Sequence, residues 1–177
     1  MSFQKQISDI IIKCVQGDIT SQDVDVVVNA ANAKLEPGGG VAGAVHREAG
    51  PKLYEECKEI GSIEVGKCVV TGGYDLPNDN VIHCLGPRYG ADPQAKEHLA
   101  RCYKEALRLA DERKLKSIAF PAISTGAFGY PVEEAAKVSW EAVEEVLGDL
   151  ESIEEIRFVL YDSSDLEVYK EEMKKVG

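Results

Sequence analysis

The sequence predicts an α/β fold, in which a largely parallel β-sheet lies between layers of helices. Two observations predict it. Strand-like apolar runs alternate with segments of helical periodicity, and several of these runs are almost continuously apolar, as expected for strands covered on both faces. The chain has 177 residues, which fits one domain with one core, and we expect that domain to span residues 1–177.

Six apolar runs are expected to form strands. The first two, DIIIKCVQ and VDVVVNA, lie close together near the start of the chain. The next two, GKCVVTGGY and NVIHCLGP, follow the first helical region, and LKSIAFPAI and IEEIRFVLYD complete the set. In order, the six segments cover residues 9–16, 24–30, 66–74, 80–87, 115–123 and 153–162.

Four helical regions separate these strands. Residues 41–61 form the first, interrupted at Gly50 and Pro51, and residues 94–113 form the second, with apolar side chains at helical spacing. Residues 131–149 open with Pro131 and acidic residues, which favour a helix start. Residues 163–175 combine a Ser or Asp cap with a basic last turn.

Charge and composition exclude several function classes. The chain carries 20 Lys and Arg against 31 Asp and Glu, a formal net charge of −11, which argues against broad duplex binding through basic side chains. Backbone N–H groups can still bind one small anion. No apolar run reaches the ~18 residues of a membrane span, and the start of the chain lacks the features of a signal peptide. We therefore expect a cytoplasmic protein, or a nuclear one in a eukaryote, and take a monomer as the default.

The cysteines suggest neither a disulfide framework nor a metal site. Their number is five, which is odd, and no C-x-x-C spacing occurs. We expect no metal and no cofactor.

The segment NAANAKLEPGGGVAGAVH (29–46) combines two asparagines and three glycines between a strand and a helix. Glycines there let the backbone approach a ligand, and the following helix start favours an anion. The spacing is not that of a dinucleotide fingerprint. Taken alone, the glycines are compatible with a phosphate site or with a tight turn.

A second loop, FPAISTGAFGYP (120–131), also leaves a strand and enters a helix. Ligands of open α/β sheets bind outside the carboxyl ends of the strands, so two such loops could grip a diphosphate from opposite sides. Phe128 in this loop is either an anchor that packs the loop onto the core or an apolar surface for a sugar ring.

The motifs GDIT, VDVVVNAAN, GGGVAGAVHREAG, VIHCLGP and IAFPAISTGAFGYP occur in the order found in macro domains, which bind ADP-ribose. The chain resembles this family over nearly its whole length. The resemblance implies a three-layer α/β/α sandwich with a central mixed, mostly parallel sheet, and ADP-ribose bound in a crest-like cleft.

The resemblance also assigns the ligand site. Asp18 would accept the adenine amino group, with Ile19 beside it, although Asp18 could also be a turn or helix cap and Ile19 an ordinary buried residue. Tyr161 would stack on adenine. The diphosphate and the distal ribose would be lined by Gly38, Gly39, Gly40, Val41, Ser124, Thr125, Gly126, Ala127 and Phe128.

Three residues are candidates for catalysis. Asn32 would hold the hydroxyls of the distal ribose and help to position water, and Phe128 would border the ribose. Macro-domain hydrolases of one branch carry a histidine where this chain has His46, although a lone histidine on an apolar helix face is more often a satisfied core residue. Asn29 and His83 are expected to be structural.

This chain departs from the hydrolase branch at two positions. Ala42 stands where that branch usually has an aspartate that orients the attacking water, and Pro37 stands where similar viral domains have a histidine. The resemblance nevertheless implies ADP-ribose binding and hydrolysis of mono-ADP-ribose from acidic side chains of proteins, or deacetylation of O-acetyl-ADP-ribose. The alternatives are a reader module without turnover and, disfavoured by the charge, a binder of RNA or poly-ADP-ribose.

Overall fold

The computed structural model describes residues 2–175, so the first and last residues of the expected domain lie outside it. Its centre is a seven-stranded sheet in the order β1-β2-β7-β6-β3-β5-β4. Neighbours from β2 to β5 are parallel, whereas the edge strands β1 and β4 are antiparallel. This confirms the mixed, mostly parallel sheet. The strands are β1 (Ser2–Ile7), β2 (Ile10–Gln16), β3 (Val26–Ala30), β4 (Cys68–Gly72), β5 (Asn80–Cys84), β6 (Ser117–Phe120) and β7 (Glu155–Leu160).

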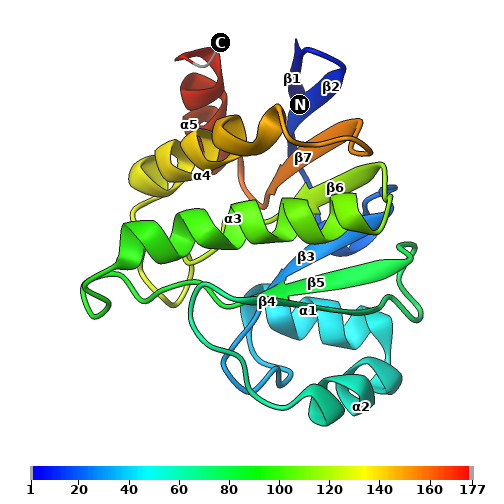
Figure 1. The fold of residues 1–177 in the computed structure, drawn as a ribbon. Coiled ribbons are helices and arrows are strands. Elements are labelled where there is room, and N and C mark those ends of the chain that lie inside the picture. The colour runs from blue at the N-terminus through cyan, green and yellow to red at the C-terminus, as the bar shows by residue number, and fades with distance from the viewer. Residues whose placement is uncertain (1, 176–177) are drawn as a thin grey trace.

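Helices cover both faces of the sheet, which confirms the three layers (Figure 1). One layer holds α3, α4 and α5, and the other holds α1, α2 and the short 3₁₀-helix η1. No helix in residues 2–175 is long and apolar enough to cross a membrane. The helices are α1 (Gly40–Ala49), α2 (Pro51–Ile60), α3 (Ala95–Glu112), α4 (Val132–Leu147) and α5 (Ser163–Lys175), and η1 covers Ile19–Ser21.

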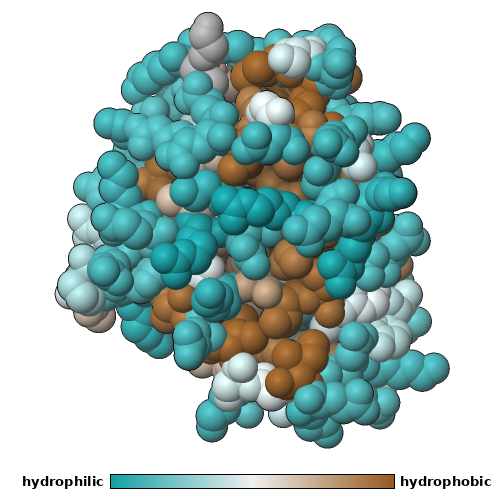
Figure 2. Space-filling model, viewed as in Figure 1, coloured by the Kyte–Doolittle hydropathy of each residue, from teal (hydrophilic) through white to brown (hydrophobic). Residues whose placement is uncertain are grey.

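Each interlayer space holds its own apolar core. The larger core lies under α3, α4 and α5 and is built around aromatic rings in contact, with Phe158 centred 4.7 Å from Trp140 and 5.6 Å from Phe120. The smaller core lies between the sheet and the helices α1 and α2 and contains Leu53 and Val45. Outside these cores, Figure 2 shows hydrophilic residues over most of the face that α3 and α4 form.

The strand β1 was not predicted, because we began the first strand at residue 9. In β1 every second residue is half-buried and the others are exposed, so it lacks the continuous apolar run used to find the central strands. Phe3, Lys5 and Ile7 alternate with polar residues, the period-two pattern of a strand with one solvated face. An edge position with a lysine suits such a strand.

Candidate functional site

The carboxyl ends of four neighbouring strands lie side by side along one end of the sheet. β2, β7, β6 and β3 are parallel neighbours, so their ends point the same way. The distance from β2 to β3 is three strand spacings, about 14 Å. The site residues expected from the sequence follow these ends: Asp18 and Ile19 after β2, Tyr161 after β7, Ser124 to Phe128 after β6, and Asn32 and Gly38 to Val41 after β3.

Asp18 lies at the β2 end and caps η1. Its Oδ1 accepts hydrogen bonds from the backbone N–H of Thr20 at 2.8 Å and from the Thr20 hydroxyl at 2.6 Å. These bonds lower the pKa of the Asp18 carboxyl, so the group is ionised at neutral pH. The second oxygen, Oδ2, accepts no hydrogen bond from residues 2–175 and is left for an external donor. The cap expected from the sequence is therefore present, and it leaves half of the carboxylate free.

Tyr161 and Ile19 flank Asp18 in different ways. The side chain of Tyr161 is 88% exposed at the end of β7, and the backbone N–H of Gly17 donates to Leu160 at 2.9 Å, which joins the two strand ends. Ile19 is buried in the core under α1. Tyr161 thus offers a free aromatic face next to the turn that holds Asp18.

The first glycine loop leads into α1 and leaves its amides uncapped. Gly39 is the N-cap, and no side chain of the described residues caps this helix. Gly38, Gly39 and Gly40 are exposed, and Gly40 has a φ of 55°, in the left-handed region that favours glycine. Free N–H groups in the first turn of a helix form a site for an anion.

Gly43 was not among the expected site residues. Because it has no side chain, it lets this loop pack closely against α1. A Cβ at Gly43 would lie 2.3 Å from the carbonyl oxygen of Gly38, closer than real Cβ contacts allow. The sequence signal for it is a glycine inside a helical pattern, which is tolerated but often has a packing reason.

Asn32 lies against this loop. Its Nδ2 donates to the carbonyl of Glu36 at 2.8 Å, and its Oδ1 accepts from the N–H of Glu36 at 2.9 Å. A Cβ at Gly38 would lie 3.4 Å from the same Nδ2. The Asn32 amide therefore closes a small loop and borders the glycines, with one N–H and one acceptor site still available.

The second loop is anchored by its two ends. Ile123 and Tyr130 are buried in the larger core, and the N–H of Tyr130 donates to the carbonyl of Ser124 at 2.9 Å. Ser124 has a φ of 69°, uncommon for a residue other than glycine. Between these anchors, Gly126 and Ala127 are exposed.

Gly86 determines how closely the second loop approaches β5. A Cβ at Gly86 would lie 2.2 Å from Ser124 Oγ and 2.6 Å from Ile123 Cγ2, so only glycine fits. The sequence placed Gly86 at the end of a strand expected over residues 80–87, but β5 ends at Cys84, and the contact of Gly86 with the second loop could not be read from the sequence.

Phe128 is not a core anchor. It is half-buried and lies outside both apolar cores of the described residues. The guanidinium of Arg88 lies 4.5 Å from the centre of its ring, and its carbonyl accepts from the N–H of Tyr89 at 2.9 Å. The ring therefore lies beside Arg88 at the loop tip and outside the apolar cores, and its contact with a sugar ring stays a prediction.

A chain of buried polar groups lies beneath α1. Asn29 Nδ2 donates to His83 Nδ1 at 3.0 Å, and His83 Nε2 lies 2.9 Å from Thr71 Oγ1. The Thr71 hydroxyl donates to the carbonyl of Gly72, so it accepts from His83 and fixes a neutral imidazole. Burial, assisted by the nearby His46, lowers the pKa of His83 to about 3. Asn29 and His83 are thus structural, as expected.

His46 lies on the buried face of α1. Its ring centre is 6.0 Å from that of Tyr54 and 6.3 Å from that of His83. Neither ring nitrogen has a hydrogen-bond partner within the described chain, and burial lowers the pKa of His46. This position favours a neutral buried residue over one that meets a ligand directly.

A hollow of about 490 Å³ opens beside the second loop, between the start of α3 and α4. Tyr89, Tyr130, Lys96 and Glu134 are among its lining residues. None of its lining residues is among those expected to bind the ligand, so it is separate from the site at the carboxyl ends of β2, β7, β6 and β3.

Comparison with known proteins gives a consistent match. Residues 28–139 match the family model described as Macro domain. A macro domain-containing protein of Chlorobaculum tepidum is 47% identical over 163 residues, 92% of this chain and 95% of that protein. The ADP-ribose glycohydrolase MACROD2 of Xenopus laevis is 44% identical over 163 residues, which cover 90% of this chain and 39% of that longer protein. The solved structure of a mutant Oceanobacillus iheyensis macrodomain with ADPR has a TM-score of 0.95 at 37% identity, covering 99% of this chain and 98% of that chain.

Proposed function

The chain belongs to the macro domain family, and from this premise we propose that it binds ADP-ribose along the edge formed by the ends of β2, β7, β6 and β3. One observation carries the proposal: four parallel strand ends bring a half-free carboxylate, an exposed aromatic ring and two glycine-containing loops to a single edge. The similar structure with ADPR supports the choice of ligand.

The ligand lies across the strands in this proposal. Asp18 Oδ2 accepts the adenine amino group, and Tyr161 stacks on the base. The diphosphate meets backbone N–H groups of the Gly38–Val41 and Ser124–Phe128 segments, which explains how a chain of net charge −11 holds an anion. The distal ribose lies between Asn32 and Phe128.

Replacing Asp18 by alanine is expected to weaken ADP-ribose binding by at least about tenfold, because a charge-assisted hydrogen bond to the amino group is lost. Calorimetric titration measures the change. Asp9→Ala is the matched control, because Asp9 is an exposed aspartate at the other end of β2. An Asp18→Ala affinity equal to that of the wild type would refute the adenine assignment.

We further propose that the protein hydrolyses mono-ADP-ribose from acidic side chains, with O-acetyl-ADP-ribose as a related ester substrate. The relative named as an ADP-ribose glycohydrolase supports this reaction class. Water attacks the anomeric carbon of the distal ribose, the bond to the carboxylate oxygen breaks, and the carboxylate leaves with the bonding pair. The proton lost by the water passes to solvent. Asn32 positions the ribose and the water, and Phe128 restricts the ribose.

Asn32→Ala is expected to lower turnover at least about tenfold more than it lowers affinity, because water positioning matters in the transition state and less in the bound ground state. The assay measures release of label from a protein mono-ADP-ribosylated on glutamate, alongside calorimetry of the same variant. Asn32→Asp retains the acceptor for the N–H of Glu36 but loses the donor to its carbonyl, so thermal unfolding of both variants shows how far loop closure is disturbed. Equal losses of turnover and affinity would show that Asn32 contributes to binding and not to catalysis.

The second candidate function is a reader that binds ADP-ribose without hydrolysing it. Ala42 favours it, because this buried methyl group in the first turn of α1 can neither accept a proton nor hold water. The same assay decides between the two functions. Label that stays on the target at micromolar concentrations of protein, with ADP-ribose binding intact, would establish the reader.

A further inference from the structure

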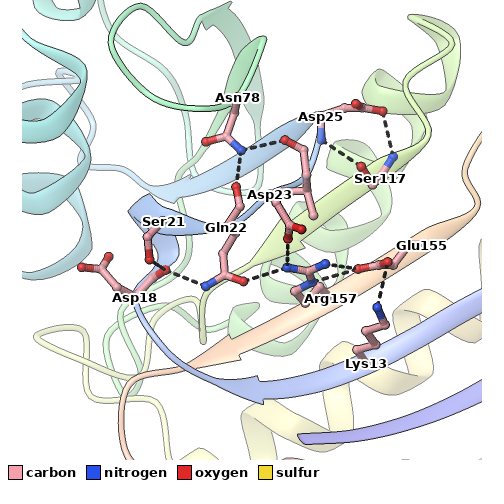
Figure 3. Close-up of polar contacts among 11 residues, drawn as sticks. Lys13, Asp18, Ser21, Gln22, Asp23, Asp25, Asn78, Ser117, Glu155 and Arg157 are labelled. Carbon is pink, nitrogen blue, oxygen red and sulfur yellow. Dashed lines mark hydrogen bonds and ion pairs between the residues drawn. The ribbon is translucent and has the colours of Figure 1, made fainter.

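We propose that Gln22, held in place by Arg157, is a positioning residue that fixes the Asp18 carboxylate and thereby sets the preference of this site for adenine. The inference rests on the proposed function, because it assumes that Asp18 meets the base. Gln22 is 9% exposed, and Figure 3 shows it between Asp18 and Arg157.

Asp18 is fixed from both sides. Its backbone carbonyl accepts from Gln22 Nε2 at 2.7 Å and from the N–H and the hydroxyl of Ser21, each at 3.2 Å. Its Oδ1 is held by Thr20. In Figure 3 the carboxylate lies on the side of Asp18 away from Gln22. The main chain and one carboxylate oxygen are therefore constrained, which fixes the direction of Oδ2.

The amide of Gln22 has one possible orientation. Its Oε1 accepts from Arg157 Nη1 at 3.0 Å, and a guanidinium has only donors, so the oxygen must face Arg157. The Nε2 group then faces the carbonyl of Asp18. The carbonyl of Gln22 itself accepts from Asn78 Nδ2 at 2.9 Å, which holds the main chain at this point.

Arg157 lies on β7, which ends one residue before Tyr161, and its side chain is held by two carboxylates. Its Nε donates to Glu155 Oε2 at 2.8 Å and its Nη1 to Asp23 at 2.7 Å, and its side chain is 12% exposed. Lys13 on β2 pairs with the other oxygen of Glu155 at 3.1 Å. Arg157 and Gln22 therefore link β7, which ends at the stacking ring, to the turn that carries the carboxylate.

A fixed carboxylate discriminates between bases. The adenine amino group donates to Oδ2, whereas the hypoxanthine of inosine diphosphate ribose presents a carbonyl oxygen that the carboxylate repels. A carboxylate free to rotate away would avoid this repulsion and would lose part of the bond to adenine. In this proposal Asp18 distinguishes adenine from hypoxanthine. Gln22 increases the difference in affinity because it keeps the carboxylate from rotating away.

The test measures the affinities for ADP-ribose and for inosine diphosphate ribose by calorimetry. The wild type is expected to prefer ADP-ribose by at least about tenfold, and Gln22→Met is expected to reduce this ratio to at most about threefold. Gln22→Glu keeps an acceptor for Arg157 and loses the donor to Asp18, so it should reduce the ratio in the same way. Lys104→Met removes an ion pair between α3 and α4, outside this network, and should leave the ratio unchanged.

The outcomes are distinct. A wild type that binds ADP-ribose without preferring it over the inosine compound would remove the adenine assignment of the proposed function itself. A wild-type preference that both Gln22 variants retain would overturn the inference alone. Equal losses for both ligands would also overturn it, since they would show a general loosening of the turn. Thermal unfolding identifies a variant that fails to fold, and Gln22→Glu then decides the result.

Discussion

Gly43→Ala is expected to weaken ADP-ribose binding by at least about 100-fold, the loss of two or more charge-assisted hydrogen bonds to the diphosphate. In an exposed helix this substitution would normally stabilise the protein by about 1 kcal/mol. Here the new Cβ would lie 2.3 Å from the carbonyl oxygen of Gly38. The contact is with backbone, so Gly38 and the loop before α1 must move away from Gly43. Calorimetric titration with ADP-ribose measures the result.

The control for this prediction is Gly148→Ala. Gly148 ends α4 with a φ of −69°, and a Cβ there meets no atom within 4 Å. This variant should bind like the wild type and unfold at the same or a slightly higher temperature. Full affinity in a folded Gly43→Ala variant would show that the diphosphate does not lie on this loop.

Acidification is expected to lower the free energy of unfolding by roughly 3 kcal/mol between about pH 6.5 and pH 4 through His83 alone. Burial lowers the pKa of His83 to about 3 in the folded protein. In the unfolded chain the imidazole takes up a proton below about pH 6.5. The unfolded state then binds more protons, so stability that is complete above that pH is lost as the pH falls. Urea unfolding across this range measures the loss.

His83→Gln separates this contribution from the others. The variant should be less stable at neutral pH, because the bonds to Asn29 and Thr71 are disturbed, and its stability should depend less on pH. His46 acts in the same direction and remains in both proteins. NMR titration of the wild-type His83 gives a direct check. A pKa near 6.5, or equal pH slopes for the two proteins, would contradict the neutral buried imidazole.

The sequence predicted the strands that helices cover on both faces of the sheet, because such strands are almost continuously apolar. Strands β2 to β7 and all five helices of the described chain fall on the expected segments. β1 escaped prediction because an edge strand with one solvated face lacks a continuous apolar run. Its alternation of Phe3, Lys5 and Ile7 is a weaker signal of the same kind.

The sequence motifs identify the loops that form the candidate site. They do not identify the residues that hold those loops in place. Residues next to a strand end, such as Asp18 and Asn32, stand beside recognisable motifs. Gln22, Gly43 and Gly86 act through atoms that are distant in the chain or that only a folded backbone brings near. No local pattern encodes that a glutamine will meet an arginine 135 positions later.

The order of the strand ends across the sheet makes the site bipartite. The ends of β2 and β7 would take the adenosine half of the ligand, and the ends of β6 and β3 would take the ribose phosphate half. Each fragment alone, such as AMP or ribose 5-phosphate, would then bind weakly. The covalent pyrophosphate bridge would raise the effective concentration of the second fragment once the first is docked, as in a bivalent ligand. Selectivity for the intact nucleotide sugar would therefore come from linkage between two modest half-sites.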